Sequence, residues 1–321
     1  MAVVGVTGAS GFLGGALVPS LAREGFDLRL VDDFSGPIQV VHPSHPVTRC
    51  DFRSPQAEKI LSDADVVLHL AAVSGVVPCA EDPRGSRAVN VEGTRGLLER
   101  LRDRRIPLAF ASSFAVVGVP ERLPITEETP PAPTHAYAEQ KAEGEALVHA
   151  LLSGTAGGAI LRMSNLYGKY TLGSRVIAKG NVLNLFARQA WEGSLRVNAP
   201  GTQRRDFIHL EDVVAHWVSA TRYLRDGRAR GGVTTFNVAS GETASILELA
   251  ERVRAAWAKL HPEQAPLRIE IVPNPRGSIE LLQPEFSVDR RRTEKELGVR
   301  CRHDLSTSLE EILQGSGPSG P

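Results

Sequence analysis

A strand that runs straight into a glycine turn at the start of the chain limits the fold more than any other feature. Residues 2–6 are a short apolar run of the kind that is buried on both faces of a parallel sheet, and residues 12–24 have helical periodicity. Between them, Gly8 permits a tight turn, Gly11 lets backbone amides approach a phosphate, and Gly14 lets the helix pack closely on the strand. The sequence therefore predicts a βαβ unit with an anion site at the helix N-terminus.

A second apolar strand, residues 26–31, ends in Asp32 and Asp33. Asp32 follows the glycine turn by roughly the 20 residues at which an acidic side chain meets the adenosine ribose in dinucleotide-binding folds. A carboxylate there accepts hydrogen bonds from the ribose hydroxyls and repels a 2′-phosphate, so the sequence favours NAD over NADP as cofactor. The alternative interpretation is that the two aspartates only end the strand, as turn-forming residues often do.

Strand and helix patterns alternate through the first half of the chain. Apolar strand patterns cover residues 66–72, 108–112 and 160–164, and helical patterns cover 87–102 and 136–152. This alternation predicts an α/β fold, a doubly wound parallel sheet of the Rossmann type with ligands beyond the carboxyl ends of its strands. We also expect a smaller α/β substrate lobe, because 321 residues exceed one typical core.

The alternation stops after Asn165, where glycines and basic residues precede a helical pattern at 182–191. The predicted parts are an NAD-binding domain (residues 1–166, with 205–240 partly returning to it), a substrate-binding lobe (167–204 and 241–313) and a flexible tail (314–321). The tail is rich in glycine, proline and serine and has nothing to bury.

Composition excludes several classes of function. The formal net charge is zero, so no overall field attracts nucleic acid or an acidic membrane surface. No apolar run approaches the roughly 18 residues of a membrane span, and the chain begins with a strand rather than a cleavable signal, so we expect a cytoplasmic protein. Cys50, Cys79 and Cys301 are isolated, which predicts neither a disulfide framework nor a metal site.

Tyr137 and Lys141 lie one helical turn apart within residues 136–152, and therefore on one helix face. A tyrosine with an ordinary pKa of about 10 is a poor base at neutral pH, but a neighbouring ammonium and the positive nicotinamide of NAD⁺ both favour the phenolate. Ser113, at the end of a predicted strand, can hydrogen-bond the same substrate oxygen. The YxxxK pattern alone is common on ordinary helices. Together with the glycine turn, Asp32 and a strand-end serine it predicts a proton-transfer site beside the dinucleotide.

These motifs resemble those of the extended short-chain dehydrogenase/reductases of the nucleotide-sugar epimerase/dehydratase group, from residue 3 to about residue 313. The matching segments are TGASGFLG (7–14), HLAA (69–72), VNVEGT (89–94), SSFAVVG (112–118), YAEQK (137–141), LRMSNLYG (161–168), RDFIHLEDVV (205–214), FNVASGE (236–242) and DRRRTEKELG (289–298). The resemblance implies a Rossmann fold, NAD as cofactor and a nucleotide sugar, most simply a UDP-sugar, as substrate.

The resemblance also implies roles for individual residues. Ser113, Tyr137 and Lys141 become the catalytic group. The implied cofactor-binding residues are Gly8, Ser10, Gly11, Phe12, Leu13, Asp32, Asp33, Asp51, Phe52, Leu70, Ala71, Ala72, Asn90, Tyr137 and Lys141. The implied substrate-binding residues are Ser113, Asn165, Asn181, Val182, Arg205 and Arg276. A planar guanidinium suits the nucleotide diphosphate, because it can bond two phosphate oxygens at once.

The chain departs from the related 4,6-dehydratases directly after Ser113. Those enzymes carry an Asp-Glu pair there, whereas this chain has Phe114 and Ala115, which cannot remove water. The resemblance therefore implies a 4-epimerase of UDP-hexoses or UDP-hexuronic acids, in which Tyr137 takes the C4 hydroxyl proton and hydride returns to the opposite face of a 4-keto sugar. The alternatives are an NDP-4-keto-sugar reductase, a 4,6-dehydratase and a non-catalytic NAD-binding protein.

A carboxylate at C6 of the sugar would need a cation in a site that excludes water. Arg175, in the irregular stretch 169–179, is the candidate, and a solvated loop arginine is the alternative interpretation. The helices expected at 87–102 and 136–152 resemble those that form a four-helix interface in this family, which implies a homodimer.

Overall fold

The central element is a seven-stranded sheet in which every neighbouring pair of strands is parallel. The computed structural model describes residues 1–229, 231–274 and 285–314. The strand order is β12-β6-β5-β4-β1-β2-β3, which confirms the predicted doubly wound α/β fold. The strands are β1 (Val3–Thr7), β2 (Asp27–Asp32), β3 (Thr48–Arg49), β4 (Val66–His69), β5 (Leu108–Ser113), β6 (Gly158–Met163) and β12 (Val233–Val238).

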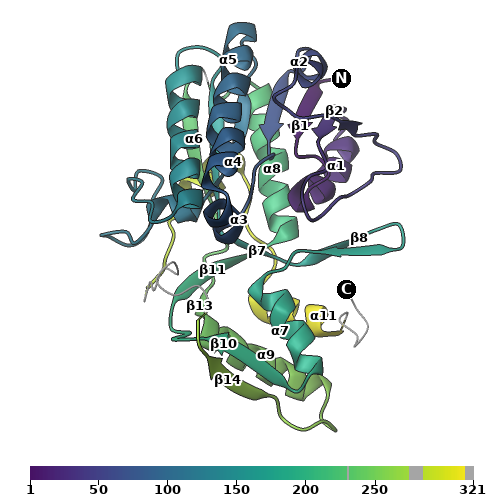
Figure 1. Ribbon diagram of the computed structural model, residues 1–321, viewed down its shortest axis with the longest axis vertical. Helices are drawn as coiled ribbons and strands as arrows, with labels where there is room; N and C mark the ends of the chain where they lie inside the picture. Colours follow the sequence, from purple (N-terminus) through teal and green to yellow (C-terminus); the bar gives the residue numbers. More distant parts are fainter. Residues whose placement is uncertain (230, 275–284, 315–321) are drawn as a thin grey trace.

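Two helical layers cover this sheet (Figure 1). Helices α1 (Phe12–Arg23) and α8 (Leu210–Arg225) pack on one face, and α2 (Pro55–Leu61), α5 (Thr94–Arg104) and α6 (Ala136–Leu152) pack on the other. Alternate side chains of each strand fill the two layers: Val66 and Leu68 of β4 lie in the core under α1 and α8, and Val67 lies in the core under α5 and α6. Burial on both faces is why these strands read as continuous apolar runs.

Short helical turns join β4 to α5. They are α3 (Val76–Glu81), α4 (Pro83–Arg87) and the π-helical turn η1 (Ala88–Gly93). The helix predicted at 87–102 is thus two pieces with different winding, a π-helical turn followed by α5. A 3₁₀ turn, η2 (Phe114–Val117), follows β5 directly. Within the described part of the chain no helix is both long and apolar enough to cross a membrane.

The second lobe lies below the sheet in Figure 1 and has a core of its own. Its helices α7 (Val182–Trp191) and α9 (Ile246–Leu260) pack on the parallel pair β10 (Ser194–Asn198) and β14 (Arg268–Val272), and α11 (Leu305–Gln314) packs on α7 and α9. A small sheet of β7 (Asn165–Tyr167), β11 (Arg204–His209) and β13 (Thr243–Ser245) stands between the two lobes. Helix α10 (Arg291–Leu297) returns to pack on β12 and α8.

The stretch after Asn165 is more regular than its sequence suggests. Residues predicted to be irregular form the antiparallel hairpin of β8 (Lys169–Leu172) and β9 (Arg175–Ala178). The hairpin packs against α1, because the Tyr170 ring lies 5.8 Å from the Phe12 ring and Ile177 belongs to the core under that helix. The prediction of an irregular segment here is wrong because Gly173 supplies the left-handed turn residue that closes a hairpin.

The glycine turn brings α1 against β1 more closely than any side chain would allow. Gly8 has a φ of +73°, and a Cβ at this position would lie 2.6 Å from the Ala71 amide nitrogen. A Cβ on Gly14 would lie 2.3 Å from the Gly8 carbonyl oxygen. Both obstacles are backbone atoms, which cannot move aside as a flexible side chain can. The tight turn predicted at Gly8 and the close helix packing predicted at Gly14 are therefore present.

We expect Gly14→Ala to lower the free energy of unfolding by about 1–3 kcal/mol, because overpacking against backbone outweighs the higher helix propensity of alanine. Gly96→Ala is the matched control: it also lies inside a helix, but its Cβ would come no closer than 3.7 Å, to the Arg100 Nη1. Urea denaturation of both variants measures the difference. An equal gain in stability in both would contradict the close contact.

Candidate active site

The N-terminus of α1 fits a dinucleotide diphosphate. Gly11 is the N-cap residue, no side chain caps the helix, and the first turn holds no acidic residue. The first backbone N–H groups of the helix therefore have neither a side-chain partner nor a repelling charge, which suits an anion. A Cβ on Gly11 would meet no atom closer than 3.4 Å, so the side of the turn away from β1 is open.

Asp32 ends β2 beside this turn, as the sequence predicts. One carboxylate oxygen accepts a hydrogen bond from the Ser10 amide at 2.9 Å and the other accepts from the Phe34 amide at 2.7 Å. Burial raises the pKa of Asp32, and these two amides act against that shift. The carboxylate is thus tied to the glycine turn, where a ribose would lie next to the diphosphate, and the donor set fits NAD.

The other proposed cofactor residues surround the same edge of the sheet. Leu70, Ala71 and Ala72 follow β4, and Phe52 is buried with its ring 5.0 Å from that of His69. Two carboxylates have protein partners here: Asp33 accepts from the Ser35 amide at 2.9 Å, and Asp51 pairs with the Arg53 guanidinium at 2.5 Å. Their contacts with NAD stay predictions.

Asn90 is buried in η1, and each of its side-chain atoms has a protein partner. Its Oδ1 accepts from the Val73 amide at 2.8 Å, while its Nδ2 donates to the Val73 carbonyl at 2.9 Å and to the Gln140 Oε1 at 2.7 Å. The residue therefore fixes the chain that leaves β4. This is a role that the sequence motif did not indicate.

The three proposed catalytic residues come together beyond the carboxyl end of β5. Ser113 is the last residue of β5, and its Oγ accepts from the Ala115 amide at 3.2 Å. Helix α6 starts after His135, which caps it, so Tyr137 lies in its first turn and Lys141 one turn later. The Lys141 ammonium donates to the Ala111 carbonyl at 2.7 Å, which ties α6 to the same strand.

Burial dominates the electrostatics of this group. It raises the pKa of Tyr137, and the hydroxyls of Ser74 and Ser113 favour the phenolate against it. Burial also lowers the pKa of Lys141 to about 8, an effect that the charge of Lys179 reinforces. The effect of the Lys141 ammonium on the phenol stays a prediction. In the protein alone the two hydroxyls favour the phenolate, and burial outweighs them.

Sequence reasoning missed Ser74 and Lys179. Ser74 follows β4 in a segment where no spacing marks it, and only the strand order brings it to α6. Lys179 lies between β9 and α7, and its carbonyl accepts from the Asn181 amide at 2.8 Å. Arg175, the cation chosen from the sequence, is exposed on β9.

The proposed substrate residues line the start of the second lobe. Asn165 begins β7 and its Nδ2 donates to the Asp206 carbonyl at 3.0 Å. Asn181 caps α7, accepting from the Asn184 amide at 2.8 Å, and Val182 is the first helical residue. Arg205 lies on β11, where its Nη1 donates to the Arg204 carbonyl at 2.7 Å. Arg276 lies outside the described residues.

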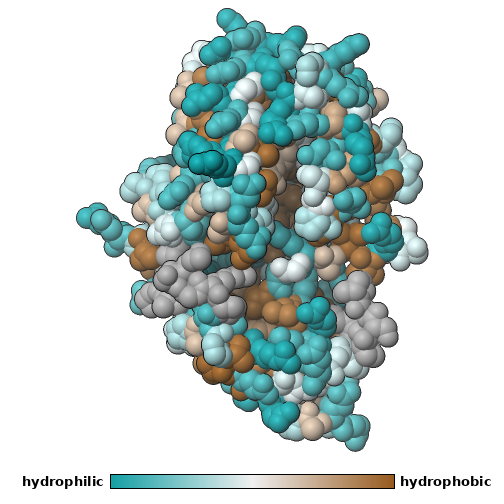
Figure 2. Space-filling model, viewed as in Figure 1, coloured by the Kyte–Doolittle hydropathy of each residue, from teal (hydrophilic) through white to brown (hydrophobic). Residues whose placement is uncertain are grey.

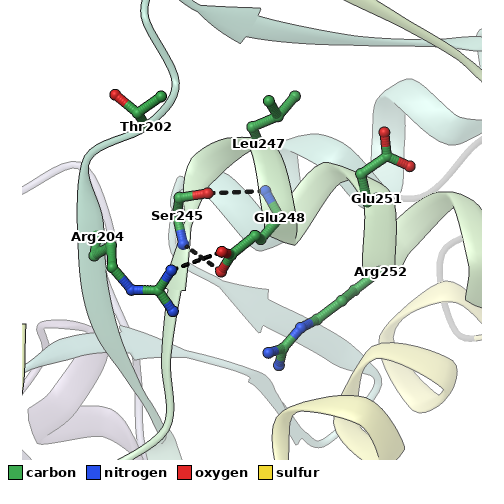
Figure 3. A pocket seen from close by; sticks show the side chains of 7 residues that line it. All are labelled: Thr202, Arg204, Ser245, Leu247, Glu248, Glu251 and Arg252. Atoms are coloured by element: carbon green, nitrogen blue, oxygen red, sulfur yellow. Dashed lines mark hydrogen bonds and ion pairs between the residues drawn. The ribbon is translucent and has the colours of Figure 1, made fainter. Parts of the chain in front are cut away.

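A pocket and a cluster of possible metal ligands lie apart from this edge of the sheet. A pocket of about 540 Å³ on the second lobe is lined by residues such as Arg204 and Glu248, which pair at 2.6 Å (Figure 3), and it holds none of the proposed site residues. His209, Glu211 and His303 bring possible metal ligands within 4.8 Å of one another in the described part of the chain. The His209 Nδ1 already accepts the Glu211 amide as the cap of α8, so binding through it would uncap the helix.

Fold and site together define a Rossmann-type protein with a Ser-Tyr-Lys group at its dinucleotide edge. Residues 4–239 match the model of the NAD dependent epimerase/dehydratase family. A putative UDP-glucose 4-epimerase of Methanocaldococcus jannaschii is 30% identical over 259 residues, 78% of this chain and 80% of the relative. A UDP-glucose 4-epimerase of Corynebacterium glutamicum is 28% identical over 322 residues, 95% and 93% of the two chains. The solved structure of MoeE5 in complex with UDP-glucose and NAD is 25% identical, with a TM-score of 0.78 over 98% of both chains.

The chain belongs to the NAD-dependent epimerase/dehydratase family. The resemblance inferred from the motifs is thereby confirmed, and so is NAD as the cofactor. The family match ends at residue 239, within the segment that follows β12. The relatives extend the similarity into the second lobe, since the Corynebacterium glutamicum protein covers 95% of this chain.

We expect Lys141→Met to stabilise the protein at pH 7 by up to about 3 kcal/mol, because a shift of one pKa unit corresponds to about 1.4 kcal/mol. The pKa of Lys141 falls from its ordinary 10.5 to about 8 on folding, so the native state carries the cost of a buried charge below pH 8. As the pH rises to 10.5 the native state releases its proton first, and wild-type stability rises relative to the variant.

Urea denaturation at pH 7 and pH 10 measures this difference. Lys59→Met, which replaces an exposed lysine of α2, is the control and should show no such change. A constant difference between wild type and Lys141→Met over that pH range would contradict a buried, charged Lys141.

Proposed function

We propose that this protein is an NAD-dependent nucleotide-sugar 4-epimerase that acts on a UDP-hexose. The observation that carries the proposal is the meeting of Ser113, Tyr137 and Lys141 beside the glycine turn, with Phe114 and Ala115 where an eliminating enzyme needs an acid and a base. The names of the relatives, UDP-glucose 4-epimerases, support the choice of UDP and of a hexose.

Each residue of this group has a separate task in the proposed reaction. NAD, when bound, supplies the hydride acceptor and donor. Tyr137 accepts the proton of the C4 hydroxyl and later returns it, and Ser113 holds the same oxygen by a hydrogen bond. Lys141 keeps a positive charge next to the phenol, which favours the phenolate once substrate has displaced water. Asn165, Asn181, Val182, Arg205 and Arg276 are the residues we propose for the nucleotide and sugar.

A neutral hexose fits the site better than a hexuronic acid. A C6 carboxylate needs a cation within the site, and Arg175 is exposed on β9 of the β8–β9 hairpin. The positive charge of Lys179 contributes to the lowered pKa of Lys141. Lys179 also precedes the cap of α7, where the diphosphate of the substrate is proposed to bind. We therefore assign Lys179 to the diphosphate and rank UDP-hexuronic acids second.

A reductase of NDP-4-keto sugars is the second candidate function, since the same catalytic group would serve it. A reductase must exchange its cofactor at every turnover, whereas an epimerase regenerates NAD on the enzyme. Two results would favour the epimerase. The purified protein would retain NAD, and NMR would show conversion of UDP-glucose to UDP-galactose without added NADH. A product panel with UDP-, GDP-, CDP- and dTDP-sugars tests the nucleotide. Conversion only of 4-keto sugars with added NADH would reject the epimerase.

We also propose a cytoplasmic homodimer formed through α5 and α6. The outward positions here include Arg95 on α5, Glu139 on α6 and Glu92 on the preceding turn η1, and the part of this surface seen in Figure 2 is mostly hydrophilic. Such an interface would contain ion pairs, so it would weaken as salt screens them. Light scattering at low and high salt measures the mass, and a monomer in both conditions would reject the dimer.

Tyr137→Phe should lower kcat by about 10²–10⁴-fold while NAD and UDP bind as in wild type, because only the proton-transferring oxygen is removed. Calorimetric titration with UDP and the NAD content of the purified protein check binding, and NMR checks turnover. A variant that retained more than about a tenth of the wild-type kcat would show that another group is the base.

A further inference from the structure

A buried ion pair lies two helical turns beyond Tyr137. The Glu145 carboxylate on α6 accepts from the Arg162 guanidinium at 2.8 Å and 3.0 Å, and each side chain is only 5% exposed. No step of the proposed reaction uses either residue. A buried ion pair is poor evidence for stability by itself, because apolar residues of similar volume often stabilise as well or better. The position of the pair therefore requires another explanation.

The pair connects β6 with two segments that hold proposed catalytic residues, β5 and α6. The Ser112 hydroxyl donates to the Glu145 carboxylate at 2.5 Å, and Ser112 directly precedes Ser113. Ser112 and Arg162 are register partners across β5 and β6, so both reach the same carboxylate from adjacent strands. One carboxylate thus ties α6 to the ends of β5 and β6.

A second contact next to this one makes the attachment rigid. The Lys141 ammonium donates to the carbonyl of Ala111, the residue before Ser112. Two consecutive residues of β5 are therefore bonded to two consecutive turns of α6, at Lys141 and Glu145. Because two bonds define both the distance and the register of a strand against a helix, Ser113 has a defined position relative to Tyr137.

Arg162 also holds the segment that leads into α6. Its Nη1 donates to the carbonyls of Glu127 at 3.4 Å and Thr129 at 3.2 Å. These residues precede the cap of α6, so the helix is held before its first turn as well as along its length. None of the buried side-chain oxygen and nitrogen atoms that lack a hydrogen-bond partner in the described residues belongs to Ser112, Glu145 or Arg162, as a stable buried charged network requires.

We propose that Glu145 and Arg162 are positioning residues for catalysis, a buried pair that fixes the register of β5 against α6 and so holds Ser113 and Lys141 at the Tyr137 phenol. This inference rests on the proposed function. Glu145 and Arg162 do not touch substrate or cofactor, and they act through Ser112 and Lys141. Misplacement of a catalytic group by about 1 Å costs up to about 100-fold in rate, so a small shift of register is sufficient.

The test replaces the pair without leaving an unpaired buried charge. In Glu145→Met/Arg162→Met both charges are removed, so the protein should fold with a melting temperature near that of wild type. We expect kcat to fall about 10- to 100-fold, with the KM for UDP-glucose and the NAD content within about twofold of wild type. The control variant, Arg29→Met/Asp63→Met, removes an ion pair at the surface whose Arg29 Nη2 and Asp63 Oδ2 atoms are 3.0 Å apart. This variant should leave kcat unchanged.

Glu145→Gln/Arg162→Met isolates the bond to Ser112. Glutamine retains an oxygen that accepts from the Ser112 hydroxyl, and methionine at the same position does not. We expect this variant to recover most of the lost kcat. An unchanged kcat in Glu145→Met/Arg162→Met would overturn the proposal. Equal kcat values in the two double variants would also overturn it. So would a loss of activity that is explained by released NAD or by a raised KM.

A substrate-free measurement separates this proposal from the proposed function. The ultraviolet difference between each variant and its Tyr137→Phe counterpart reports the phenolate of Tyr137 as the pH is raised. If Ser113 and Lys141 are displaced, the midpoint pH of phenolate formation should rise by about half a pH unit or more in Glu145→Met/Arg162→Met. An unmoved midpoint overturns the positioning role even if wild type converts no UDP-sugar, while a moved midpoint with an inactive wild type rejects only the epimerase.

Discussion

The buried ammonium group of Lys141 is the constraint on which the catalytic edge of this molecule depends. It lies between the sheet and α6, where it donates to the Ala111 carbonyl at 2.7 Å and lies 5.0 Å from the centre of the Phe110 ring. A buried charge is costly unless it is bonded, so the end of β5 and the first turns of α6 have to stay together. The position of Ser113 next to Tyr137 follows from that requirement. Glu145, one turn further on, adds the negative charge that opposes the lowered pKa of Lys141.

The doubly wound topology then decides what else meets this edge. The glycine turn lies at the carboxyl end of β1 and the chain that carries Ser74 follows β4, the strand between β1 and β5. Parallel strands direct all their carboxyl ends to one side, so the dinucleotide turn and the proton-transfer group share one edge of the sheet. His69 connects β1 with α5, because its ring is hydrogen-bonded to the Thr7 hydroxyl at 2.7 Å and to the Thr94 hydroxyl at 3.0 Å. Burial lowers the pKa of His69 to about 3, so this ring is neutral.

Much of this arrangement could be predicted from the sequence because it depends on local chemistry. Gly8 is required by its positive φ and Gly14 by a backbone contact within its own segment, and Tyr137 and Lys141 share a face by helix periodicity. Ser74, Lys179 and the buried use of Asn90 could not be predicted, because each depends on which distant segment packs opposite. The hairpin of β8 and β9 was missed for a related reason. Tyr170 packs against Phe12 of α1 and Ile177 joins the core under that helix, and both partners are far away in the sequence.

The directions of two pKa shifts bear on how one phenol would act as both base and acid in the proposed reaction. Burial raises the pKa of Tyr137 and lowers that of Lys141 to about 8, so in the protein alone the phenol keeps its proton at neutral pH. A positive charge brought to this edge, such as an oxidised nicotinamide, lowers the proton affinity of the phenol, and loss of that charge on reduction restores it. Tyr137 would therefore release its proton before oxidation of the sugar alcohol and hold it firmly until the keto sugar is reduced. In the proposed cycle the enzyme returns to its starting state only if Ser113, Tyr137 and Lys141 keep their places through both half-reactions, and a rigid register between β5 and α6 would meet that requirement.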